Sequence, residues 1–224
     1  HILAQLFQRA ERGEIDLEDR ICVSKKNYCP GSGILTQLHH KIEMSLLDIA
    51  TLMMIVSDNT ATNICIDIAD MAQTNSMIQK LGLKSTYLRR KMQDETAILE
   101  HRENVSTPED MVGILQHLYN ARPSPKVARM CLDIMTKPKT GPIRSGIPQN
   151  IQLANKTGGI ENVRCDAGIV FLPKFPYAVA IMTKFGIGEP DSLGQFVTKV
   201  TKLIHETIDT LETTTDFGRG IPTV

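Results

Sequence analysis

The chain has 224 residues, and its 25 Lys and Arg residues balance its 25 Asp and Glu residues, so the formal net charge is zero. This balance gives no electrostatic reason to expect a nucleic acid or an anionic membrane surface as a partner. No apolar run reaches the roughly 18 residues that a membrane-spanning helix needs. The length and the 42% hydrophobic content fit one globular domain, or one compact domain with two lobes.

The cysteines give no sign of a metal site. Their number is odd, so they cannot all pair within one chain, and no two have the C-x-x-C spacing of zinc ligands. We interpret most of them as small buried apolar side chains, and a Cys22–Cys29 disulfide stays open. No metal or organic cofactor is predicted. The five positions are Cys22, Cys29, Cys65, Cys131 and Cys165.

Helical patterns dominate the first two thirds of the chain. Apolar residues recur at helical spacing over 2–10, and Gly13 fits a C-terminal cap. Ser45, followed three positions later by Asp48, predicts a capped helix over 46–56. This helix is apolar on nearly all faces, which is typical of a helix buried at the centre of a lobe.

More helices are predicted further along. They cover about 60–70 and 73–81, and two others begin at Thr107-Pro108 and Ser124-Pro125, where a hydroxyl residue precedes a proline. Residues 83–106 carry many charges and no clear period, which predicts a long surface loop.

The pattern changes to strands after residue 150. Segments 151–158, 165–172 and 177–185 are rich in β-branched residues, and their short connections predict an antiparallel meander. An amphipathic helix is predicted over 193–211. The tail 213–224 is expected to be poorly ordered.

This order of elements predicts an α+β fold, with a helical lobe beside an antiparallel β-sheet that a C-terminal helix closes. The helical lobe is expected over about 1–148, and the sheet with its closing helix over about 149–212. We predict that residues 1–224 form a single domain. Because three strands make a thin sheet, we expect further strands N-terminal to residue 1.

Two short motifs carry the chemistry. Ser57, Asp58 and Asn59 directly follow the predicted buried helix, where these residue types could simply cap the next helix. Lys156, Thr157 and Gly158 match K-[ST]-G and lie on the first predicted strand. Together the motifs match two of the three that mark serine penicillin-recognising enzymes. Each motif alone is weak evidence, but both lie in the structural context that this chemistry needs.

The resemblance extends over nearly the whole chain. Six segments resemble class A β-lactamase-like serine hydrolases in the same order, and the D,D-peptidase-like, penicillin-binding branch is the most similar. This resemblance implies a β-lactam or a D-Ala-D-Ala peptide as substrate, and a periplasmic or secreted location. The segments are "HILAQLFQRAERGEIDLEDR", "GSGIL", "LMMIVSDNTATN", "LGLKSTYL", "STPEDM" and "NKTGGIENVRCDAGIV".

The resemblance also implies catalytic roles. Ser57 passes a proton to the departing amine nitrogen, and Lys156 holds Ser57 by a hydrogen bond while adding positive charge near the substrate carboxylate. The backbone N–H of Gly159 supplies half of the oxyanion hole, which stabilises the developing negative charge.

The remaining site residues are implied to bind substrate. Asn59 binds the side-chain amide of the substrate, and the Thr157 hydroxyl donates to its carboxylate. Gly158 lets the substrate lie against the strand. Arg164 is a candidate anchor for the same carboxylate, although an ordinary surface arginine would also fit this position. Asp58 is expected to support the loop rather than to act on substrate.

One family motif, the S-x-x-K nucleophile motif, is absent from this sequence. No serine is followed by lysine three positions later. The resemblance predicts this motif just upstream of residue 1, with its lysine about two residues before His1. A non-catalytic binding or sensor module is the alternative that this absence keeps open, and an esterase on the same fold is another.

The glutamate that activates the deacylating water in class A β-lactamases is also absent. Its expected position falls at Met92, while Asp94 and Glu95 lie out of register. A methionine cannot activate water, so we expect slow deacylation, as in a penicillin-binding protein.

Overall fold

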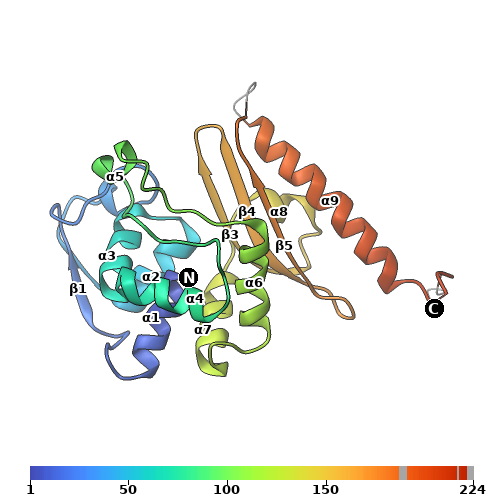
Figure 1. Cartoon of the computed structure of the whole chain (residues 1–224), viewed down its shortest axis with the longest axis horizontal. Coiled ribbons are helices and arrows are strands. Elements are labelled where there is room, and N and C mark those ends of the chain that lie inside the picture. Colours follow the sequence, from blue (N-terminus) through green and yellow to red (C-terminus); the bar gives the residue numbers. More distant parts are fainter. Residues whose placement is uncertain (187–190, 216, 221–224) are drawn as a thin grey trace. The chain divides into compact units, whose positions relative to one another are not determined.

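The computed structural model describes residues 1–186, 191–215 and 217–220 (Figure 1). The chain divides into two compact units, His1–Lys137 and Pro138–Val224. Each unit has its own arrangement of helices and strands. In the described part of the chain, no helix combines the length and apolarity that crossing a membrane requires.

The first unit is built from helices around a buried centre. Helix α1 packs against α3, α4 and α7, and α2 packs against α3 and α7. The side chains of Ile49 and Ala50 on α2 are fully buried, so the expectation of a central apolar helix is confirmed. The helices are α1 (Ile2–Glu11), α2 (Leu46–Ile55), α3 (Asn59–Ala69), α4 (Met71–Lys80), α5 (Glu95–Leu99), α6 (Pro108–Tyr119) and α7 (Pro125–Met135), with the 3-10 helix η1 (Leu35–Gln37).

The predicted helix starts are confirmed by their caps. The Ser45 hydroxyl accepts a hydrogen bond from Asp48 N at 3.0 Å at the start of α2. Thr107 caps α6 in the same way, and Ser124 caps α7 with a 3.1 Å bond from Val127 N. These caps are local in sequence, which is why the sequence pattern was sufficient to predict them.

The sequence did not predict two features of this unit, a pair of short strands and a short helix. Strand β1 (Arg20–Val23) pairs antiparallel with β2 (Ile42–Ser45), although neither segment shows a strand pattern. Helix α5 lies inside the stretch 83–106, which was predicted to be a loop throughout, and Asp94 caps it by accepting a 3.0 Å bond from Ala97 N. The uniform loop prediction for this stretch was therefore wrong over five residues.

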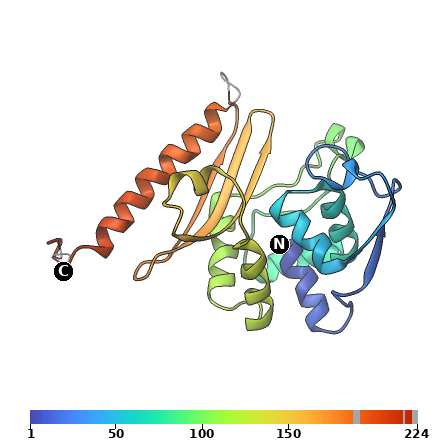
Figure 2. The ribbon, with the colours of Figure 1, turned by 180° about the vertical axis from the view of Figure 1, so that it is seen from behind.

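The second unit contains the antiparallel sheet. Its elements are α8 (Pro142–Gly146), β3 (Gln152–Ile160), β4 (Val163–Phe171), β5 (Tyr177–Thr183) and α9 (Ser192–Glu212). The strand order is β3-β4-β5, so the predicted meander is confirmed. Helices α8 and α9 pack on each other and on this sheet, as the view from behind also shows (Figure 2).

A compact apolar core lies between the sheet and these two helices. Ile143 from α8 and Val170 from β4 are fully buried in it, and Ile204 and Ile208 from α9 pack against it. The predicted α+β fold with a closing C-terminal helix is confirmed, while the short helix α8 was not predicted. Of the tail at 213–224, Thr214 and Gly220 form an isolated bridge, and residues 216 and 221–224 lie outside the described residues.

The five cysteines are free thiols, so no disulfide joins Cys22 to Cys29. Burial raises the pKa of both Cys65 and Cys131 to about 12. These two thiols therefore behave as buried apolar side chains, as the sequence indicated.

Candidate active site

The Ser57-Asp58-Asn59 motif forms the turn between α2 and α3. Ser57 has a φ of 53°, in the left-handed region that residues other than glycine rarely adopt. Asp58 is the N-cap of α3, because its Oδ1 accepts a 2.9 Å hydrogen bond from Ala61 N. The capping interpretation is thus correct for Asp58, and the cap leaves the neighbouring residues half-buried at the turn.

Asp58 also anchors the loop that precedes η1. Its Oδ2 accepts hydrogen bonds from Ile34 N at 2.7 Å and from Leu35 N at 2.9 Å. The side chain is only 1% exposed, and three N–H donors compensate for the burial of the carboxylate. Gly33, with φ of 114°, lies so close that a Cβ there would collide with this carboxylate. Asp58 therefore ties the turn to the loop, as expected of a supporting residue.

Asn59 is held by the same loop. Its side-chain Nδ2 donates to the carbonyl of Pro30 at 2.7 Å, and its backbone N donates to the carbonyl of Ser32 at 2.9 Å. The first bond restrains the side-chain amide, and the second holds the main chain of Asn59 against the loop. The predicted binding residue is therefore preorganised from two sides, by α3 and by the loop.

The backbone of Met92 is bonded to Asn63, a residue of α3. Met92 N donates to Asn63 Oδ1 at 2.7 Å, and Asn63 Nδ2 donates back to the carbonyl of Met92 at 3.2 Å. Cys29 Sγ also donates to this carbonyl at 3.4 Å. The position of residue 92 is therefore fixed by its main chain, independently of its side chain.

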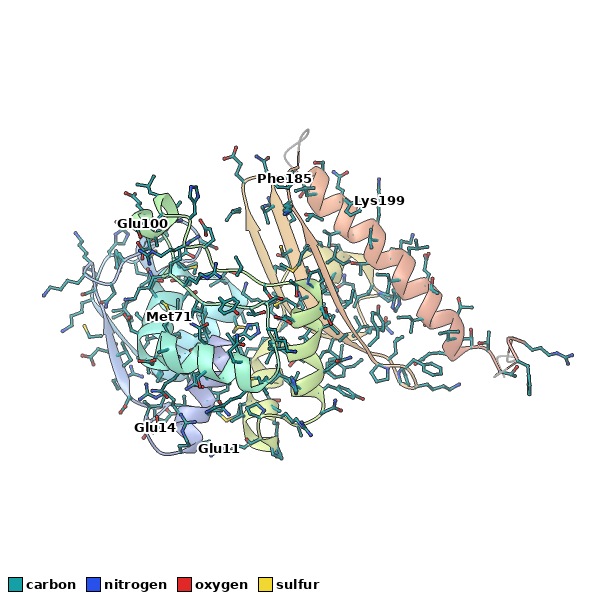
Figure 3. All side chains as sticks on the ribbon, viewed as in Figure 1. Glu11, Glu14, Met71, Glu100, Phe185 and Lys199 are labelled. Atoms are coloured by element: carbon teal, nitrogen blue, oxygen red, sulfur yellow. The ribbon has the colours of Figure 1, made fainter. Side chains whose placement is uncertain are left out.

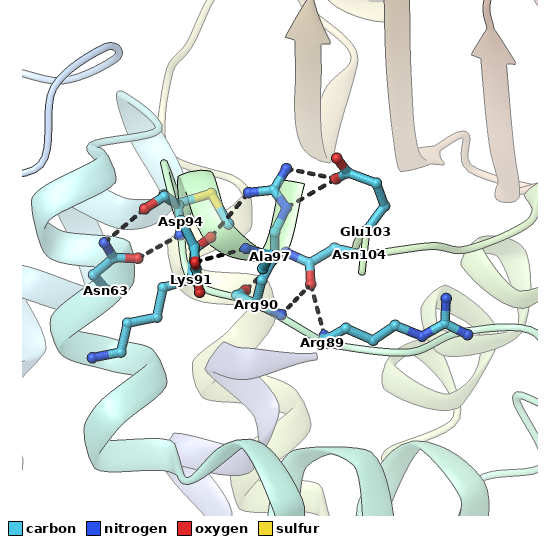
Figure 4. A network of polar contacts seen from close by, with 9 residues as sticks. Asn63, Arg89, Arg90, Lys91, Asp94, Ala97, Glu103 and Asn104 are labelled. Atoms are coloured by element: carbon cyan, nitrogen blue, oxygen red, sulfur yellow. Dashed lines mark hydrogen bonds and ion pairs between the residues drawn. The ribbon is translucent and has the colours of Figure 1, made fainter. Parts of the chain in front are cut away.

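Residues 89–90, just before Met92, are held by the side-chain amide of Asn104 and by one ion pair (Figure 4). Asn104 Oδ1 accepts from Arg89 N at 2.8 Å and from Arg90 N at 3.0 Å, and its Nδ2 donates to the carbonyl of Arg90. The Arg90 guanidinium pairs with Glu103 at 2.7 Å. The residues that precede Met92 are thus bonded to Glu103 and Asn104.

The second motif lies on β3. In the register with β4, Lys156 stands opposite Ala167, Thr157 opposite Asp166 and Gly158 opposite Cys165. Lys156 Nζ donates to the carbonyl of Thr157 at 2.6 Å. Burial lowers the pKa of Lys156 to about 8, with the charge of Asp166 acting in the opposite direction and the charge of Lys139 lowering it further.

Asp166 was missed by the sequence analysis. It is 1% exposed, and it accepts hydrogen bonds from Asn155 Nδ2 and from Ile143 N, both at 2.9 Å. Burial raises the pKa of Asp166, and these two donors and the nearby Lys156 and Lys139 oppose the rise. An acidic residue within an otherwise apolar strand segment was a signal that could have identified it.

Lys139 was also missed, and nothing in its sequence context marks it. It is partly buried, and burial lowers its pKa to about 8, while the charge of Asp166 opposes this shift. The second unit thus places two lysines within electrostatic range of one buried carboxylate.

Arg164 turns back onto its own hairpin. Its Nη1 donates to the carbonyls of Ile160 and Val163, both at 3.1 Å. A Cβ on Gly159 would lie 2.7 Å from the same nitrogen, so the guanidinium covers this glycine. The suggested role of Arg164 in binding a carboxylate stays a prediction.

The predicted residues fall into two groups. Ser57 and Asn59 flank Asp58 in the first unit, and the K-T-G residues with Gly159 and Arg164 share the β3–β4 hairpin of the second. Within residues 1–186, 191–215 and 217–220, no three His, Cys, Asp or Glu side chains are arranged to hold a metal ion.

Known structures resemble this chain closely. A β-lactamase from Sphaerobacter thermophilus DSM 20745 is 30% identical, with a TM-score of 0.85 over 93% of this chain and 80% of that chain. PBP-A is 27% identical, with a TM-score of 0.81 over 93% of this chain and 78% of that chain. A mutant of PBP-A, described as an acyl-enzyme complex with penicillin G, gives the same values.

Sequence comparison agrees with the structures. Among curated proteins, no relative matches the chain. The family model described as the β-lactamase enzyme family matches residues 1–208. Since this match covers nearly all of the sequence, the chain belongs to the β-lactamase enzyme family.

Proposed function

We propose that the protein is a serine acyl-enzyme hydrolase that acts on β-lactams or D-Ala-D-Ala peptides and deacylates slowly. One observation carries the proposal: a member of the β-lactamase family keeps both the S-D-N and the K-T-G motif, yet has methionine where the resemblance predicts the deacylating glutamate. The penicillin G acyl-enzyme described for the PBP-A mutant supports the same chemistry.

The proposed reaction has two steps. In the first, the oxygen of a serine bonds to the carbonyl carbon of the substrate amide, and the carbon–nitrogen bond breaks. The serine proton passes to a lysine and then, through Ser57, to the departing nitrogen. In the second step, water breaks the ester and restores the serine. We propose that the serine and the lysine belong to a Ser-x-x-Lys motif preceding His1 in the full-length protein.

The remaining roles are assigned to the residues of the two motifs. Lys156 and the Thr157 hydroxyl bind the substrate carboxylate, and the Asn59 amide binds the substrate side-chain amide. Gly158 lets the substrate approach the strand, and the Gly159 N–H stabilises the oxyanion. We propose that residues 1–224 form a single catalytic domain.

The nucleophile can be tested directly. The full-length protein is incubated with benzylpenicillin, digested, and mapped by mass spectrometry. We expect the penicilloyl group on one serine that has lysine three positions later. A label elsewhere, or no label and no hydrolysis of penicillin, would remove the proposal and favour the non-catalytic alternative. Hydrolysis of p-nitrophenyl esters without any reaction with penicillin or N-acyl-D-Ala-D-Ala would favour the esterase.

Met92 gives a test of slow deacylation. Replacing Met92 with glutamate is expected to shorten the lifetime of the acyl-enzyme at least about tenfold, because a positioned general base accelerates such steps by about a hundredfold or more when ideally placed. The backbone bonds to Asn63 do not involve the side chain, so the loop should retain its conformation. The lifetime is measured from the decay of the adduct mass after free penicillin is removed.

Glutamine at the same position is the matched control, because it has nearly the same shape without a base. We expect the Met92→Gln lifetime to stay close to that of the unmodified protein. Equal lifetimes for the glutamate and glutamine variants would contradict the alignment that places the water-activating position at residue 92.

We also propose a periplasmic or secreted location, because the peptidoglycan peptides and β-lactams that this family recognises are met outside the cytoplasm. The proposed reaction uses a small-molecule substrate and needs neither a nucleic acid partner nor a cofactor.

A further inference from the structure

Gln93, the residue after Met92, has a backbone conformation that residues other than glycine rarely adopt. Its φ is 55°, in the left-handed region. A residue keeps such a strained conformation where the surrounding structure enforces it, and this is common at functional sites. The main chain of Met92 forms two hydrogen bonds with the side chain of Asn63. On the other side, Asp94 caps α5 by accepting a 3.0 Å bond from Ala97 N (Figure 4). The neighbours of Gln93 are therefore held on both sides.

The side-chain amide of Gln93 lies beside that of Asn59, next to Gly31 in the loop before η1. A Cβ on Gly31 would lie 3.1 Å from Gln93 Nε2 and 2.7 Å from Asn59 Nδ2. Because both nitrogens lie close to the same point, the two amide groups are neighbours. Gly31 has a φ of 98°, and both this conformation and this close approach require glycine. Gly31 and Gln93 are exposed, so the amide pair is open to a ligand from solvent.

The amide pair has donors and acceptors left for a ligand. Each side-chain amide offers two N–H donors and a carbonyl oxygen that accepts. Asn59 uses one donor for the carbonyl of Pro30, at 2.7 Å. Among the described residues, none is bonded to Asn59 Oδ1 or to the side-chain amide of Gln93. A peptide group is complementary to such an amide, because its carbonyl oxygen accepts from the amide N–H and its own N–H donates to the amide oxygen.

We propose that Gln93 is a specificity-determining residue that binds a second peptide group in the acyl chain of the substrate, next to the first, which Asn59 binds. This inference rests on the proposed function, which assigns the side-chain amide of the substrate to Asn59. Consecutive peptide groups are about 3.8 Å apart along a chain, so two neighbouring amides can bind two of them. The site then prefers substrates with a peptide-like acyl chain over penicillins whose acyl chain contains a single amide.

The test uses two penicillins whose acyl chains have equal length and differ in the second peptide group. One carries an N-acetylglycyl group on the amino group of the penicillin nucleus, and the other carries a pentanoyl group. The second-order rate constant for acylation of the full-length protein is measured for both by intact mass. We expect a larger rate constant for the N-acetylglycyl compound. In Gln93→Met, the ratio of the two rate constants should fall about three- to tenfold, as for the loss of one hydrogen bond.

A second variant separates the amide from the backbone conformation. Glycine adopts a φ of 55° without strain, so Gln93→Gly removes the amide and lets the main chain keep its course. We expect the ratio to fall as far in Gln93→Gly as in Gln93→Met. A fall in the methionine variant alone would attribute the effect to the new side chain and would overturn the inference.

Glu100→Met is the matched control, because Glu100 is an exposed residue of the same segment, at the end of α5 (Figure 3). It should leave the ratio unchanged. Partial misfolding of a variant lowers both rate constants and leaves their ratio unaltered. The inference is wrong if the unmodified protein reacts equally fast with both penicillins, or if both Gln93 variants keep the full ratio.

Failure of the proposed function has a different signature. If the unmodified protein forms no adduct with either penicillin and consumes neither, the function is wrong, and the amide pair is tested by equilibrium binding of the same two compounds. The NMR signals of the Asn59 and Gln93 side-chain amides should then shift, and Gln93→Met should weaken binding of the N-acetylglycyl compound about three- to tenfold. Equal affinities of the unmodified protein for the two compounds would remove the inference as well.

Discussion

Replacing Lys156 with methionine is expected to lower the second-order rate constant for acylation by benzylpenicillin about a hundredfold or more. The variant loses the positive charge that the proposal assigns to the substrate carboxylate, and removing one preorganised electrostatic donor from an acyl-transfer site typically has an effect of this size. Methionine has nearly the length of the lysine stem, so the packing around β3 is retained. The rate is followed by the growth of the adduct mass.

The lowered pKa of Lys156 predicts that the rate of acylation depends on pH. Because burial lowers its pKa to about 8, the ammonium form predominates below that pH and is lost above it. The rate constant for acylation should therefore fall as the pH rises through about 8. Because burial lowers the pKa of Lys139 to about 8 as well, this fall in the pH–rate profile reports the interacting pair of lysines and not Lys156 alone. The assigned role would be contradicted if the acylation rate constant of Lys156→Met lay within tenfold of that of the unmodified protein and fell over the same pH range.

Replacing Asp58 with alanine is expected to lower the free energy of unfolding by about 3 kcal/mol or more. Three backbone N–H groups, from Ala61, Ile34 and Leu35, would lose their acceptor, and each unsatisfied buried donor costs about 1–3 kcal/mol. The loop before η1 would lose both of its bonds to Asp58 and would be held at the start of α3 by its bonds to Asn59. Urea unfolding followed by circular dichroism measures the change.

Asp70 offers a matched control, because it is the N-cap of the next helix, α4. It accepts one such bond, from Gln73 N at 2.8 Å, so Asp70→Ala should lower the free energy of unfolding by only about 1 kcal/mol. Equal losses for the two variants would show that Asp58 acts as a cap alone and that its bonds to the loop contribute nothing to stability.

The sequence predicted those elements whose signals lie within a few residues of each other. Each of three hydroxyl residues caps the helix that follows it by accepting a hydrogen bond from the backbone N three positions ahead; they are Ser45, Thr107 and Ser124. The strands β3 to β5 are long and joined by short turns. Strands β1 and β2 are four residues each and pair across a long connection, so neither carries enough pattern to be recognised alone. Helix α5 has only five residues, which are too few to show a helical repeat.

In the candidate site, too, the sequence predicted the residues that belong to short motifs and did not predict the interactions between distant residues. Motif residues such as Ser57 and Lys156 could be named because their types and order resemble those of a known family. The structure adds what depends on tertiary neighbours: the three bonds to Asp58, the fastening of Met92 to Asn63, and the contact of Gly141 with the K-T-G strand. Asp166 and Lys139 interact electrostatically across more than twenty positions of sequence, and no local pattern predicts such an interaction.

The most direct measurement of the central claim is the intact mass of the full-length protein over time after mixing with excess benzylpenicillin, with the remaining antibiotic measured in the same sample. The account predicts a stoichiometric adduct that persists after the free antibiotic is removed. Rapid consumption of penicillin without a lasting adduct would contradict slow deacylation and make the protein an efficient β-lactamase. A protein of unchanged mass beside untouched penicillin would contradict the proposed acyl-enzyme chemistry altogether.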